Sequence, residues 1–169
     1  NEQIAATQKD PVANAIWHSC MGQFLSEYCD GNRYRISERT QLAEETPADF
    51  KEWDLKTFQR RAREEYLASL ENAQMLQAVD AKGYSELLYN KSDNKPYIRT
   101  LYEALAYHAL TYFSSQLRNE RADLSLAGDA LWHNDQFLRM PLHVTENSTM
   151  MQTVLFVYQE LTRHYLNRG

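Results

Sequence analysis

Residues 100–113 of this 169-residue chain read TLYEALAYHALTYF, and this stretch decides the fold. Thr100 and Glu103 form the sequence pattern of a capping box, in which each side chain accepts from the backbone N–H of the other residue. Apolar residues then recur around almost the whole circumference, in two adjacent stripes. The stripes are Leu101, Leu105, Ala109 and Tyr112, and next to them Tyr102, Ala106, Leu110 and Phe113. The sequence therefore predicts a central helix, from about residue 97 to about residue 117, that packs on several sides.

The composition favours a helical protein. Hydrophobic residues make up 43% and charged residues 24% of the chain, as in an ordinary globular domain. There are only five Gly and four Pro, against eleven Tyr, six Phe and three Trp, which favours long helices over turn-rich sheets. We predict an all-α fold, an irregular array of helical hairpins with about five to seven helices and no significant sheet. Residues 1–169 are expected to form one domain, with residues 1–9 as a flexible end, and to be a fragment of a larger protein.

The first predicted helix begins at Asp10-Pro11, where Asp can cap and Pro suits the first helical position. It is expected to end at residues 30–32, Asp-Gly-Asn. Its apolar stripe, which we expect to face the core, is Ala13, Trp17, Cys20, Phe24 and Tyr28. Residues 32–47 are too irregular for a helix and predict an ordered connection that buries Tyr34 and Ile36.

Further helices follow along the chain. Asp54 is expected to cap a helix that runs to about residue 71, with Leu55, Phe58, Ala62, Tyr66 and Leu70 on one face. Residues 72–88 predict two short helical turns broken near Gly83, residues 89–96 a polar loop, and residues 128–137 a short helix. Thr149 is expected to cap the last helix, whose stripe is Met151, Val154, Leu155, Tyr158, Leu161 and Tyr165.

The charge pattern argues against nucleic acid and membrane partners. The net charge is −5, and the densest basic group, Arg60, Arg61 and Arg63, is followed at once by Glu64 and Glu65. This pattern is typical of a solvated helix face. No stretch approaches the ~20 consecutive apolar residues of a transmembrane helix.

Residues that could carry chemistry are scattered. The five His, at positions 18, 108, 133, 143 and 164, form no HExxH pair, and the sequence has no CxxC, GxSxG or Gly-rich phosphate loop. We therefore predict no metal, no cofactor, no catalytic residue and no enzymatic activity. Cys20 and Cys29 lie nine residues apart on one predicted helix, so they are expected to stay unbridged, as small core residues.

The aromatic residues leave two interpretations open. Most of them lie on helical stripes and are expected to pack in the core. The alternative is that Trp17, Trp53 and Trp132, with nearby Tyr, form exposed contacts or a stacking platform.

Several strings, in order, resemble the amino-terminal helical region of bacterial alpha-2-macroglobulin-like proteins. The clearest is residues 98–110, IRTLYEALAYHAL, in which Glu103 stands where the family has Asp and the family's Pro before Thr is missing. Upstream, Asn32-Arg33-Tyr34, Arg39-Thr40, Trp53-Asp54 and residues 66–70, YLASL, follow in the family's order. The resemblance covers about residues 11–137.

This resemblance implies a non-catalytic interaction or spacer module. In the family, the bait region and the thioester belong to later domains, so the chain would be the first part of an exported protease trap. The implied location is the periplasm or cell envelope, with a lipid anchor as one form, and the implied partners are the downstream macroglobulin domains, other envelope proteins or proteases. The alternative is a stand-alone helical envelope protein that binds a sugar or a peptide. Fold alone does not decide between them.

Overall fold

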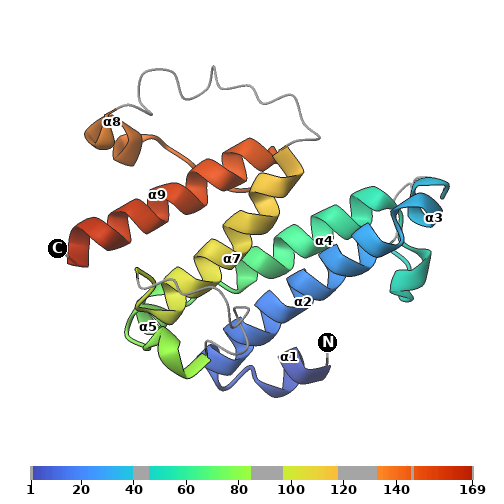
Figure 1. Ribbon diagram of the computed structural model, residues 1–169, viewed down its shortest axis with the longest axis horizontal. Coiled ribbons are helices and arrows are strands. Elements are labelled where there is room, and N and C mark those ends of the chain that lie inside the picture. The colour runs from blue at the N-terminus through green and yellow to red at the C-terminus, as the bar shows by residue number, and fades with distance from the viewer. Residues whose placement is uncertain (1, 40–45, 85–96, 118–132, 146, 169) are drawn as a thin grey trace. The chain divides into compact units, whose positions relative to one another are not determined.

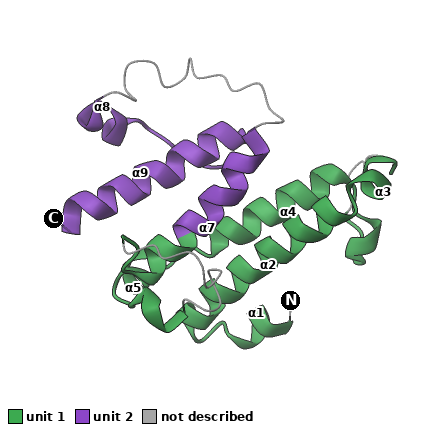
Figure 2. Cartoon of the chain, viewed as in Figure 1, with its two compact units in different colours: residues 1–105 green, residues 106–169 purple. Residues whose placement is uncertain are grey.

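The computed structural model describes residues 2–39, 46–84, 97–117, 133–145 and 147–168. The chain separates into two compact units, residues 1–105 and residues 106–169 (Figure 2). Within the described residues the regular elements are helical, apart from one isolated antiparallel bridge between Asp80 and Thr100. The prediction of an all-α fold is confirmed.

The first unit is built around two long helices. Its elements are α1 (Glu2–Ala6), α2 (Pro11–Gly31), α3 (Arg33–Ser37), the 3-10 helix η1 (Phe50–Glu52), α4 (Leu55–Ala68), α5 (Ala73–Gln77) and the 3-10 helix η2 (Ala81–Tyr84) (Figure 1). α7 (Leu101–Gln116) begins in this unit and continues into the second one, which also contains α8 (Asn134–Arg139) and α9 (Met150–Arg168). Residues 2–6 are helical although the sequence suggested no element there.

α2, α4 and α9 begin where the sequence predicted, because polar side chains satisfy their first N–H groups, whereas α7 begins at Leu101 and not near residue 97. The Asp10 carboxylate accepts from the backbone N–H of Val12 and Ala13, each at 3.1 Å, and that of Asp54 accepts from Thr57 at 2.8 Å. The predicted capping box of α7 is present. Two further capping contacts join Thr149 and Gln152 at the start of α9.

α2 and α4 lie side by side and run antiparallel (Figure 1), and several small residues lie on the buried side of α2. Its buried side contains Ala15, Ile16, Ser19, Gly22, Leu25 and Cys29. A Cβ atom placed on Gly22 would lie 2.8 Å from the ring of Tyr66 in α4, so the two helices approach closely at this point. The predicted stripe of α2 was therefore wrong: Trp17 and Phe24 are exposed, because the helix turns its small residues toward α4. The predicted stripe of α4 is correct at Phe58, Ala62 and Tyr66, all of which are buried.

The central helix matches the prediction most closely. Every residue of the two predicted stripes of α7 is buried, and Glu103 is buried with them. The Glu103 carboxylate accepts from the backbone N–H of Arg99 at 2.6 Å and of Thr100 at 3.4 Å, and Thr100 Oγ1 accepts from the backbone N–H of Glu103 at 3.3 Å.

Other predictions need correction. Ile36 is buried as expected, but Tyr34 is 77% exposed, because residues 33–37 form the helix α3 and its two side chains point to different sides. The 3-10 turn η2 runs through Gly83, so the chain is not broken there. Tyr158 of the predicted stripe in the last helix is exposed, and its neighbours Val157 and Gln159 are buried instead. The predicted loop at residues 89–96 and the start of the predicted helix at 128–137 lie outside the described residues.

In the second unit, the buried side chain of Gln159 in α9 hydrogen-bonds to α8 and to the residue that follows it. Gln159 Nε2 donates to the carbonyl oxygens of Phe137 at 2.6 Å and Met140 at 3.0 Å. Arg163 of α9 adds a bond to the carbonyl oxygen of Leu138 at 2.8 Å. Phe137 also packs with Leu155 in a small apolar cluster that is extended by Met140, Leu142 and Met151.

Candidate functional site

The side of α2 that faces away from α4 carries the strongest sign of function in the first unit. Trp17 is 41% exposed and Phe24 is 47% exposed, and the two positions are seven residues apart, which corresponds to about two helical turns. Cys20 and Met21 lie between them and are half-buried. We define the outer face of α2 as Ala13, Trp17, Cys20, Met21 and Phe24.

A chain of ring contacts joins this outer face to the core. The Phe24 ring lies 5.8 Å from that of Phe50 in η1, and the Phe50 ring lies 5.0 Å from that of Tyr28. Tyr28 stacks on the buried Phe58 of α4 at 5.7 Å. Edge-to-face and offset contacts of this kind stabilise aromatic clusters beyond the area they bury. The exposed Phe24 ring is therefore held by its neighbours at one end of the outer face.

Trp53 belongs to the same cluster but is not an open platform. Its ring lies 5.4 Å from that of Phe58, and its Nε1–H donates to the carbonyl oxygen of Pro47 at 2.7 Å. The Arg61 guanidinium lies over the ring, 6.0 Å from its centre, at the limit of a cation–π contact. Of the three tryptophans predicted as exposed contacts, Trp17 is the exposed one, Trp53 is half-buried, and Trp132 lies outside the described residues.

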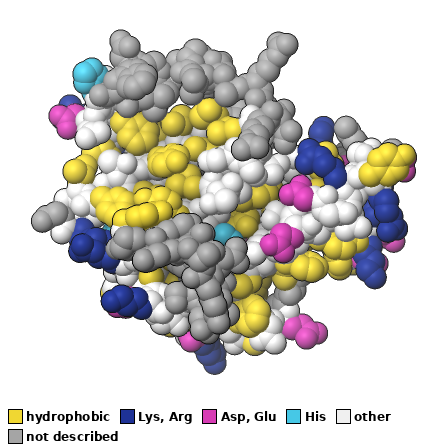
Figure 3. Space-filling view, viewed as in Figure 1, with side chains coloured by type: hydrophobic (Ala, Val, Ile, Leu, Met, Phe, Trp, Pro, Cys, Tyr) yellow, Lys and Arg dark blue, Asp and Glu magenta, His cyan; other side chains and the backbone are white. Residues whose placement is uncertain are grey.

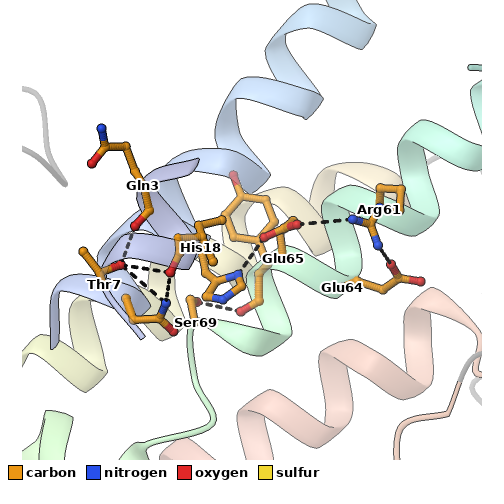
Figure 4. A network of polar contacts seen from close by, with 10 residues as sticks. Gln3, Thr7, His18, Arg61, Glu64, Glu65 and Ser69 are labelled. Carbon is orange, nitrogen blue, oxygen red and sulfur yellow. Dashed lines mark hydrogen bonds and ion pairs between the residues drawn. The ribbon is translucent and has the colours of Figure 1, made fainter. Parts of the chain in front are cut away.

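A polar network joins α2 and α4 on another side of the pair (Figure 4). His18 Nδ1 lies 2.7 Å from Oε2 of Glu65, and the two side chains are 20% and 9% exposed. Arg61 lies 3.7 Å from the other oxygen of Glu65 and 2.8 Å from the carboxylate of Glu64. The contact between His18 and Glu65 is the link of this network between the two helices. The network also corrects the prediction of a wholly solvated basic face, since Arg63 and Glu65 are buried.

The cysteines are free thiols, as predicted. Burial raises the pKa of the Cys20 thiol. Burial also raises the pKa of Cys29, with a further upward contribution from the Asp30 carboxylate and a smaller opposing one from Arg33. A raised pKa reduces the fraction of the reactive thiolate at neutral pH, so these shifts disfavour both thiols as nucleophiles.

Elsewhere, exposed apolar and charged residues gather at two places. Figure 3 shows hydrophobic side chains over α9, where Tyr158 and Leu166 are exposed. It also shows Lys and Arg side chains at the end of the first unit where α3 lies, and Arg33 and Arg35 of that helix are exposed. Acidic residues are mixed with these, as in the pair between Arg33 and Asp30 at 3.5 Å.

The described residues contain no group of three or more His, Cys, Asp or Glu side chains placed to hold a metal ion. Among the helices in that part of the chain, none has both the length and the hydrophobicity of a membrane span. Comparison with protein-family models, with curated proteins and with solved structures gives no match.

The outer face was not recognised as exposed from the sequence, although a signal was present. The opposite side of α2 carries Ala15, Ser19 and Gly22, spaced three or four residues apart. Small residues at this spacing permit close approach of a second helix, and this pattern predicts the contact side better than hydrophobicity does in a helix that is apolar on both sides.

Proposed function

We propose that this chain is a non-catalytic helical interaction module whose contact surface is the outer face of α2. The observation that carries the proposal is the pair of exposed aromatic side chains, Trp17 and Phe24, on the side opposite the α4 contact. Interfaces are enriched in such aromatic residues, which bury a large area when a partner binds. The ring contacts of Phe24 with Phe50 support the proposal further, because a pre-ordered side chain loses little entropy on binding.

The resemblance described above suggests the wider setting of this module. In that setting the chain is the amino-terminal helical region of an exported alpha-2-macroglobulin-like protein, and the outer face of α2 docks on the domains that follow it. Protease trapping would then be carried out by those later domains. This part of the proposal is tested by reading the coding sequence on both sides of the segment: a long β-rich region with a Cys-x-Glu-Gln motif downstream supports it, and a stop codon directly after Gly169 contradicts it.

The interaction surface itself is tested by photo-crosslinking in the host cell. A photoreactive amino acid at position 17 is expected to give adducts with another polypeptide or with another part of the same one. The same amino acid at Glu71, an exposed position outside the outer face, is the matched control. Equal labelling at the two positions would contradict the proposal.

One observation favours a second candidate, a sugar- or peptide-binding protein. The exposed indole of Trp17 is of the kind that stacks on flat apolar surfaces of ligands. In that case, Trp17→Phe is expected to abolish the change in tryptophan fluorescence that a ligand mixture produces, while the protein gives no adduct with a macromolecule at position 17.

A further inference from the structure

We draw no further inference here: the strongest candidate, the exposed aromatic patch of Trp17 and Phe24 on the outer face of α2, belongs to the surface already proposed for interaction, and nothing in the structure shows what covers it.

Discussion

Gly22 of α2 lies directly against the ring of Tyr66 in α4, with space for a hydrogen atom but not for a methyl group. The contact brings two helix backbones together and leaves Tyr66 buried.

Replacing Gly22 with Ala is expected to destabilise the first unit. The added Cβ would lie 2.8 Å from Tyr66 Cδ2, so the ring or the helix must shift. Overpacking of this kind costs about 1–3 kcal/mol, which exceeds the roughly 0.5–1 kcal/mol that Ala gains over Gly in a helix. Chemical denaturation measures the difference. Gly31→Ala in the same helix is the control, because outside the neighbouring backbone of its own helix no atom lies within 4 Å of the added Cβ. Equal effects at the two positions would contradict the packing argument.

Alkaline pH is expected to weaken the fold through Tyr66. Burial raises the pKa of Tyr66 to about 12, with the Glu27 and Cys20 charges adding to it and a hydrogen bond with Ser26 opposing it. The unfolded chain ionises at a pKa of about 10, so this contribution is present below pH 10 and is lost as the pH rises toward 12. The slope reaches at most about 1.4 kcal/mol per pH unit. The free energy of unfolding of Tyr66→Phe should fall less steeply than that of the wild type; parallel curves would contradict the assignment.

The hydrogen-bonding contact between His18 and Glu65 is expected to couple α2 and α4. In a double-mutant cycle with Ala at both positions, we expect a coupling free energy of about 1–3 kcal/mol near neutral pH, because the pair is short and largely buried. The control cycle uses Asp30 and Arg33, whose side chains are 64% and 46% exposed. There the coupling should stay below about 0.5 kcal/mol. Similar coupling free energies in the two cycles would show that burial does not strengthen the contact between His18 and Glu65.

In the second unit, Gln159→Leu is expected to weaken the attachment of α8 to α9. The substitution removes the two hydrogen bonds to the carbonyl oxygens of Phe137 and Met140. Each carbonyl oxygen keeps one backbone donor, the N–H of Met140 or of Leu142, so the cost is that of two lost hydrogen bonds, about 0.5–1.5 kcal/mol each. Hydrogen exchange of the amides in α8 should accelerate accordingly. Thr162→Ala is the control, since the Thr162 hydroxyl bonds within α9, to the carbonyl oxygen of Tyr158; unchanged exchange in the Gln159 variant would contradict this role.

The positions of the long helices could be predicted because their signals are local. Asp10, Asp54, Thr100 and Thr149 each mark a helix start within three residues, and capping depends on little beyond that distance. The burial of α7 was equally predictable, since a helix that is apolar on nearly all sides leaves no choice of core side.

The orientation of α2 could not be predicted from hydrophobicity, because both of its sides are apolar. The partner helix decides which of the two sides is buried. The ring of Tyr66 fits only against a residue without a side chain, which is Gly22. The pair formed by His18 and Glu65 was missed for a related reason, since the two residues are 47 positions apart in the sequence. The sequence suggested a site at three tryptophans. Within the described residues, the candidate site consists of Trp17 and its neighbours on the outer face.

The two sides of α2 are also exposed to different kinds of selection. On the side toward α4, acceptable substitutions are limited by size at Gly22 and its neighbours, whatever the protein does. On the other side, folding alone would tolerate a polar residue at the exposed Trp17, whereas Phe24 also packs against Phe50. In related chains, position 17 should therefore vary freely unless a partner binds it. In an alignment of related chains, variation on the α4 side of this helix would therefore report the constraint of folding, and variation on the exposed side would report the constraint of binding.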